Sequence, residues 1–116
     1  MENGKVEKYH EIEGYELPEK IGEVGDKMYN YQIYANEKKL EIRVNVKGIG
    51  LNFIFQGEKE KLIKSNLINK DDGISKIAFD IKQTIQYCQH KVEKDINNNY
   101  LKLTVNGREF NCIQII

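Results

Sequence analysis

The chain has 116 residues, of which 31% are charged and 40% hydrophobic, and its 18 basic and 18 acidic side chains cancel. This length suits one domain with one core, and zero net charge argues against the positive field that draws proteins to nucleic acid or anionic membranes. No apolar run approaches the ~18 residues that cross a bilayer, and the chain does not open with a signal-peptide core. We therefore expect a cytoplasmic protein, or a secreted one if an export signal was removed.

The basic residues are nearly all lysine, because Arg43 and Arg108 are the only arginines. Arginine is the usual side chain for bidentate contacts to guanine or phosphate, so its scarcity argues further against nucleic acid. Abundant Lys, Ile and Asn are typical of the A/T-rich genes of many low-GC bacteria and their phages. A bacterial or phage origin is therefore expected.

Residues 1–27 form an acidic arm, with four Lys against seven Glu and one Asp. Gly14, Pro18, Gly22 and Gly25 interrupt any helix there. The arm is expected either to add an edge strand or to stay mobile. Residues 28–116 are expected to form a single α+β domain.

Two turns divide the next part of the chain into three strands with alternating apolar residues. A turn at Asn36-Glu37 pairs Ile33 with Leu40, and a turn at Gly48-Ile49 pairs Val44 with Phe53. This three-stranded meander has one apolar inner face and one solvated outer face. The expected inner residues are Tyr29, Tyr31, Ile33, Leu40, Ile42, Val44, Val46, Leu51, Phe53 and Phe55. The expected outer residues are Gln32, Tyr34, Glu41, Arg43, Asn45, Lys47, Asn52 and Gln56.

Beyond a lysine-rich connector at 57–73, the apolar period changes to that of a helix. Apolar residues from Ile74 to Val92 fall on one face, so a long amphipathic helix is expected to pack on the sheet and to stop near residues 97–99. Asn106-Gly107 then predicts a C-terminal hairpin in which Leu103 faces Phe110. The predicted fold class is thus α+β, with an antiparallel sheet of about five strands. The apolar last residues, 113–116, are expected to lie inside the sheet or against another chain, which includes a homodimer.

No catalytic group stands out in the sequence. His10 and His90 are the only histidines, and neither has a metal-ligand partner at a useful spacing, so no metal or cofactor is expected. Cys88 and Cys112 are too few for a disulfide scaffold and are expected to be reduced thiols on apolar faces. Serine and threonine occur in no nucleophile motif. The chain is therefore expected not to be an enzyme.

The back of the predicted helix is the one feature that packing of this domain does not explain. Lysine and glutamate are expected on such a face. The residues found there instead are Phe79, Gln83, Gln86, Tyr87 and His90. Either these residues bind a partner, or the arm or the 57–73 connector covers Phe79 and Tyr87.

The sequence thus predicts a small protein-binding module, such as an immunity, antitoxin-like or phage or plasmid accessory protein that occludes a partner's surface. One alternative is a weak nucleic-acid binder that uses lysine contacts to phosphate. Its candidate residues are Lys38, Lys39, Lys59, Lys61 and Lys64. A second alternative is a small enzyme without a recognisable motif.

Overall fold

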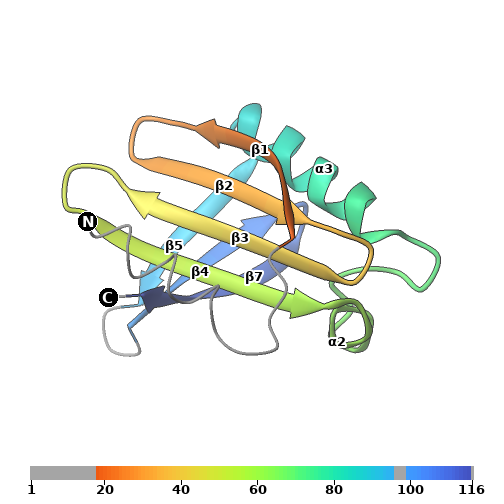
Figure 1. The fold of residues 1–116 in the computed structure, drawn as a ribbon. Coiled ribbons are helices and arrows are strands. Elements are labelled where there is room, and N and C mark those ends of the chain that lie inside the picture. The colour runs from red at the N-terminus through yellow and green to blue at the C-terminus, as the bar shows by residue number, and fades with distance from the viewer. Residues whose placement is uncertain (1–17, 96–98, 116) are drawn as a thin grey trace.

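The computed structural model describes residues 18–95 and 99–115, which form one antiparallel sheet and two helices. Figure 1 shows the elements. In chain order they are β1 (Glu19–Gly25), β2 (Tyr29–Ala35), β3 (Lys39–Val46), β4 (Leu51–Glu58), α2 (Lys59–Lys64), α3 (Ile74–Gln86), β5 (His90–Asp95), β6 (Tyr100–Val105) and β7 (Arg108–Ile115). The 7-stranded sheet has the order β1-β2-β3-β4-β7-β6-β5.

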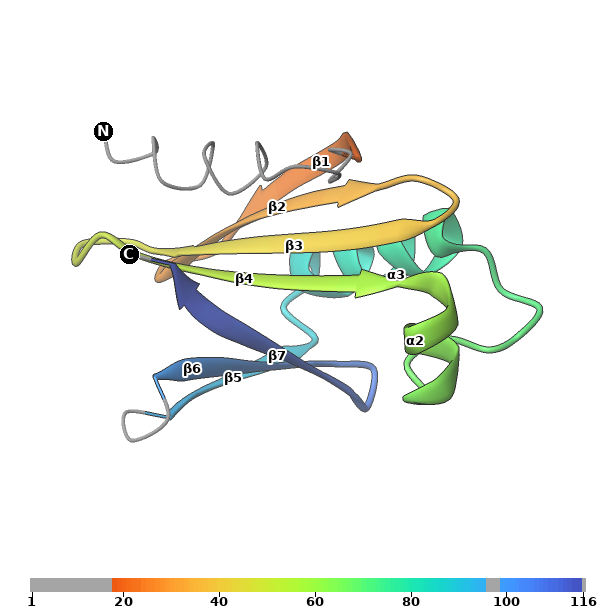
Figure 2. The same ribbon diagram turned by 60° about the horizontal axis from the view of Figure 1, so that its bottom comes forward.

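The sheet curls into a half-barrel, and α3 lies along its concave side (Figures 1 and 2). The helix contacts β1, β2, β3 and β6. Its buried residues are Ile74, Ile77, Ala78, Ile81, Thr84 and Ile85. The predicted fold class is therefore wrong: the described residues form seven strands, not about five, and the helices are short, with 6 and 13 residues.

The predicted long helix ends early because the chain turns sharply after Gln86. Cys88 has a φ of 60°, in the left-handed region. The Gln89 amide donates to the Thr84 carbonyl at 2.9 Å, and the Cys88 amide donates to the Ile85 carbonyl at 3.0 Å. These two bonds are those of a Schellman C-cap. Residues 90–95, expected to continue the helix, instead form the edge strand β5.

Two of the three predicted registers are confirmed. Val44 pairs with Phe53 across β3 and β4, and Leu103 pairs with Phe110 across β6 and β7. Asn106 and Gly107 have φ of 53° and 76°, as a type I′ turn requires.

The β2–β3 register differs from the prediction by two residues, since Ile33 faces Ile42 rather than Leu40. The Asn36 side chain explains the difference. Its Oδ1 accepts hydrogen bonds from the Lys38 and Lys39 amides, at 2.8 and 2.7 Å, so Asn36 opens the turn instead of lying at its centre. A shift of two keeps every side chain on its predicted face, and the predicted inner residues do pack in or against the core.

The arm and the last strand are described in part. Residues 1–17 lie outside the described residues, whereas Glu19–Gly25 form β1 and pair with β2. Strand β7 lies inside the sheet, between β4 and β6. The homodimer expected through this strand stays a prediction.

Candidate functional site

The solvent face of α3 gathers four of the five residues predicted to bind a partner. Phe79 is 52% exposed, and Tyr87, at the C-cap, is 65% exposed. Gln86 is exposed and Gln83 is half-buried. The exposed rings show that the 57–73 connector does not cover Phe79 and Tyr87. The opposite side of α3 is anchored in the core, so the face is held on a rigid element.

His90 does not belong to this face. It begins β5, and its side chain is only 6% exposed. Its Nε2 lies 2.9 Å from the Tyr31 hydroxyl and 3.2 Å from Oδ2 of Asp26. Asp26 also accepts hydrogen bonds from the Met28 and Tyr29 amides through Oδ1. The cluster therefore joins the β1–β2 turn to β5, which are at opposite edges of the sheet.

Burial shapes the chemistry of this His90 cluster. Tyr31 is fully buried, and desolvation, aided by the Asp26 carboxylate, raises the pKa of its hydroxyl far above the ordinary value. Tyr31 is thus a neutral hydrogen-bonding group rather than a source of phenolate. Nδ1 of His90 is buried and has no hydrogen-bond partner among the described residues. The arrangement fits a structural role, in which these hydrogen bonds hold the two edges of the sheet together.

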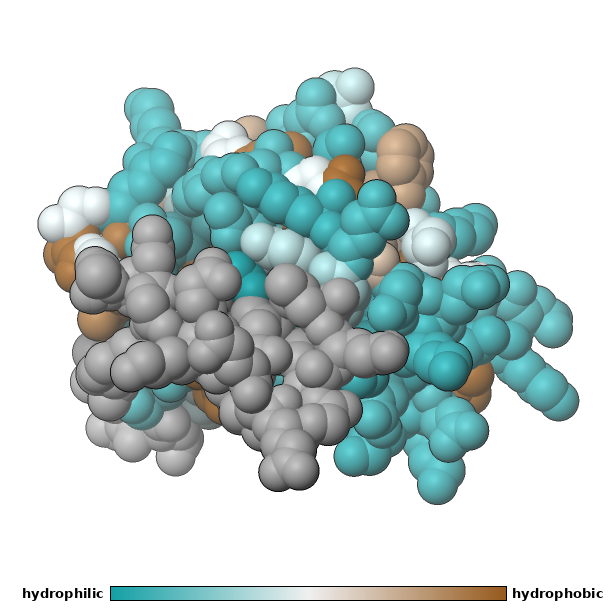
Figure 3. Space-filling view, in the orientation of Figure 1, coloured by the Kyte–Doolittle hydropathy of each residue, from teal (hydrophilic) through white to brown (hydrophobic). Residues whose placement is uncertain are grey.

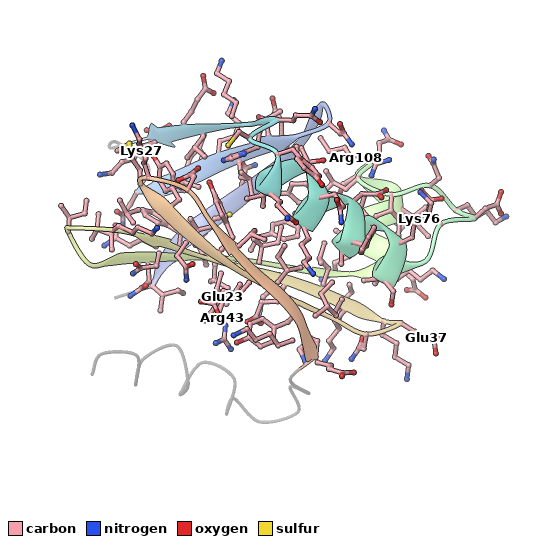
Figure 4. All side chains as sticks on the ribbon, turned by 90° about the horizontal axis from the view of Figure 1, so that it is seen from above. Glu23, Lys27, Glu37, Arg43, Lys76 and Arg108 are labelled. Carbon is pink, nitrogen blue, oxygen red and sulfur yellow. The ribbon has the colours of Figure 1, made fainter. Side chains whose placement is uncertain are left out.

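The outer face of the sheet holds a second buried polar group. Glu41 is fully buried and Arg43 is 9% exposed, so the prediction that both are solvated is wrong. Arg43 Nε donates to Oε2 of Glu41 at 2.6 Å, and Gln56 Nε2 donates to Oε1 at 2.7 Å. The Arg43 guanidinium stacks 4.3 Å from the centre of the Tyr34 ring. Figure 4 shows Arg43 projecting from the side of the sheet away from α3.

The five lysines proposed for nucleic acid gather at one end of the molecule. Lys38 and Lys39 lie at the β2–β3 turn, and the other three lie on α2. The Lys59 amide donates to the Lys38 carbonyl at 2.8 Å, which ties the two segments together. Glu37, Glu58 and Glu60 are interleaved with the lysines in sequence and are also exposed. The resulting charge is mixed rather than a continuous basic stripe.

The two cysteines lie in different environments. Cys112 is buried, and desolvation raises the pKa of its thiol to about 12. Cys88 is exposed at the end of α3, so its predicted place on an apolar face is wrong. Both are free thiols.

Within residues 18–95 and 99–115, no group of three or more His, Cys, Asp or Glu could hold a metal ion.

Comparisons with protein-family models, with curated proteins and with solved structures find no match for the chain. In the described part of the chain, no helix is long and apolar enough to cross a membrane.

Figure 3 shows a mainly hydrophilic face, with hydrophobic groups mostly at its margins. Besides Phe79 and Tyr87, the large hydrophobic residues most exposed are Met28, Ile49 and Ile113. Met28 and Ile49 occupy the β1–β2 and β3–β4 turns, where the Lys47 amide bonds the Met28 carbonyl at 2.8 Å. Both are aliphatic side chains on turns, without the aromatic rings that dominate binding energy at interfaces.

The His90 cluster could not be predicted from the sequence, because His90 lies 59 residues beyond Tyr31 in the chain and was expected on a helix. Cys88 occupies the position where the helix ends, with a φ of 60°. An αL C-cap usually carries glycine or asparagine, and a cysteine there does not announce the end of a helix.

Proposed function

We propose that this chain is a small protein-binding module that uses the solvent face of α3 to cover a surface of its partner. Immunity, antitoxin-like and phage or plasmid accessory proteins act by such occlusion. The observation that carries the proposal is the exposure of Phe79 and Tyr87, at 52% and 65%. Aromatic side chains are enriched at protein interfaces, and a few such anchors supply most of the binding energy.

The geometry of the face supports this role. Phe79 and Tyr87 are eight positions apart, about 12 Å along the helix axis at 1.5 Å per residue. Gln83 and Gln86 lie between them and offer amide donors and acceptors. Because α3 is already fixed by its buried side, binding orders only side chains, which lowers the entropic cost of association.

The test compares two double variants in affinity capture from the source cells. Phe79→Ala with Tyr87→Ala should weaken capture of the partner by about 2–4 kcal/mol and change the free energy of unfolding by no more than about 0.5 kcal/mol. Met28→Ala with Ile49→Ala is the matched control, because it removes two side chains of similar exposure, 59% and 58%, from the turns. The control should bind as the wild type does. A clear loss of stability in the α3 variant without a direct binding defect would refute the proposal.

A second candidate is weak binding of nucleic acid through the lysine group at α2 and the β2–β3 turn. The observation in its favour is that these five lysines, spread over two segments, lie at one end of the molecule. Binding through phosphate contacts weakens steeply as salt is added. Titration of a labelled oligonucleotide at two salt concentrations tests it, and affinity that does not respond to salt excludes it.

A further inference from the structure

The sheet opens into a wedge between β4 and β7. These strands pair only where Asn52–Ile54 meets Ile113–Ile115. Beyond that point β4 continues through Phe55–Glu58, which pairs with β3 alone, and the opposite stretch of β7, Arg108–Cys112, pairs with β6 alone. Figures 1 and 2 show the two strands diverging toward α2. Among the described residues, each strand thus presents an open edge inside the sheet.

Helix α2 lines this wedge because β4 ends in a tight reversal. A Cβ at Gly57 would lie 2.5 Å from Cδ2 of Leu62, so only glycine lets α2 fold back this closely onto β4. The turn after α2 then brings Ser65 and Leu67 toward the β6–β7 hairpin. A cleft of about 500 Å³ lies between that turn and Arg108, and a hollow of about 440 Å³ adjoins it. Both volumes are in the range of ligand sites.

The two hollows are lined by both apolar and charged side chains. The rings of Phe55 and Phe110 meet edge to face at 5.1 Å across the wedge, and Leu67 borders both hollows. Lys61 lines one hollow and Arg108 the other.

The charges that line the two hollows favour an anion. Neither Lys61 nor Arg108 forms an ion pair with another described residue within 4.0 Å. Lys39 adds a third cation. The lining also holds two acids. Glu109 lies 3.8 Å from Lys102, which offsets part of its charge. Glu58 is the last residue of β4. Lys61 and Arg108 can therefore each pair with a bound carboxylate.

We propose that the wedge binds an extended, acidic peptide segment of another protein, which adds as a short strand to the open edge of β7. An open strand edge offers rows of N–H and C=O groups that match an extended backbone. Alternate side chains of such a peptide would face Phe55 and Leu67, and its carboxylates would meet Lys61 and Arg108. This site is separate from the α3 face proposed above, and the two proposals can be tested independently.

The probe is a fluorescently labelled octapeptide of alternating valine and glutamate, titrated against the full chain by anisotropy and by ¹⁵N amide shifts. It should bind with a Kd below about 1 mM, with the largest shifts at Arg108–Cys112 and Phe55. Lys61→Gln with Arg108→Gln should weaken binding about tenfold or more, as loss of two charge-assisted contacts does. Methylation of alternate peptide nitrogens should weaken it comparably, because it removes strand pairing. Phe79→Ala with Tyr87→Ala should leave it unchanged.

Four results would overturn the proposal. They are no binding at about 1 mM peptide, equal binding of a valine–lysine octapeptide, shifts centred away from the wedge, or tighter binding of an oligothymidylate at this site. Should the double variant melt early, Lys61→Glu alone, at an exposed position on α2, carries the test. That single change should weaken the valine–glutamate peptide severalfold, and unchanged affinity in a folded variant would also refute the proposal.

Discussion

The buried pair of Glu41 and Arg43 predicts an asymmetric response to mutation. Glu41 has a fully buried side chain, and its Oε2 accepts a hydrogen bond from Arg43 Nε at 2.6 Å. Arg43→Met removes the cation and leaves a carboxylate that is still desolvated. Removal of one partner of a buried ion pair costs about 3–5 kcal/mol, so the free energy of unfolding should fall by that amount.

The reverse deletion should cost less. In Glu41→Met, Arg43 keeps its hydrogen bond to the Tyr34 hydroxyl at 3.2 Å and its stacking on the Tyr34 ring, and its side chain is 11% exposed. We expect a loss of about 1–3 kcal/mol, the range for a disturbed buried hydrogen bond. Glu41→Met with Arg43→Met removes both charges and should be nearly neutral, because hydrophobic replacement of a buried pair often is. The two single losses sum to about 4 kcal/mol or more while the double variant loses almost nothing, so the two positions should couple by about 4 kcal/mol or more.

Urea denaturation at pH 7, followed by far-UV circular dichroism, measures all four proteins of this cycle. Lys76→Met is the control, since it breaks a solvent-exposed ion pair, 3.2 Å to Asp80, whose side chains are 66% and 35% exposed. That change should stay within about 0.5 kcal/mol. If Arg43→Met lies within about 1 kcal/mol of the wild type, or if the single effects simply add, the pair is not desolvated as described and the reasoning fails.

Three further predictions concern the His90 cluster, the thiols and the helix end. Tyr31→Phe removes the hydroxyl that faces His90 Nε2 at 2.9 Å and should cost about 1–2 kcal/mol in urea denaturation; no loss would mean that this contact does not stabilise the fold. Burial raises the pKa of Cys112 from 9.0 to about 12 and also raises that of Tyr31, so both groups favour the folded state while protonated. Their stabilisation is full below the unfolded pKa values and is lost as pH rises; between pH 9 and 12 the thiol alone should cost about 4 kcal/mol. Cys112→Val should flatten that part of the pH profile, and an unchanged slope would contradict the assignment. Cys88→Gly should stabilise the protein by up to about 1 kcal/mol, because the φ of 60° at this position suits glycine, and a lower melting temperature would count against the cap.

Local rules predicted the hairpins well, because strand alternation and turn chemistry act within a few residues. Asn106-Gly107 fixed its hairpin register, and the pairing of Val44 with Phe53 followed from alternation. The error at Asn36 came from the turn residue, whose side chain caps the turn from its first position. An error of two residues in the strand register does not change which side chains are predicted to be buried, because side chains alternate between the two faces with a period of two.

The curl of the sheet and the buried polar groups could not be predicted in this way. Apolar positions from Ile74 to Val92 fit a helical period, yet the chain leaves the helix at Cys88 and Val92 belongs to β5. Glu41 occupies an outward position of a strand, which sequence rules assign to solvent. The wedge between β4 and β7 depends on long-range pairing that stops after three residue pairs, a feature with no local signal.

The most direct test of the proposed function is site-specific photo-crosslinking in the source cells. Gln86 on the α3 face is replaced by p-benzoylphenylalanine, and the exposed Lys94 on β5 is the control position. We expect one discrete heavier adduct from position 86, absent from position 94 and lost when Phe79→Ala and Tyr87→Ala are added. No adduct from position 86, or the same adducts from both positions, would contradict the claim that the solvent face of α3 binds another protein.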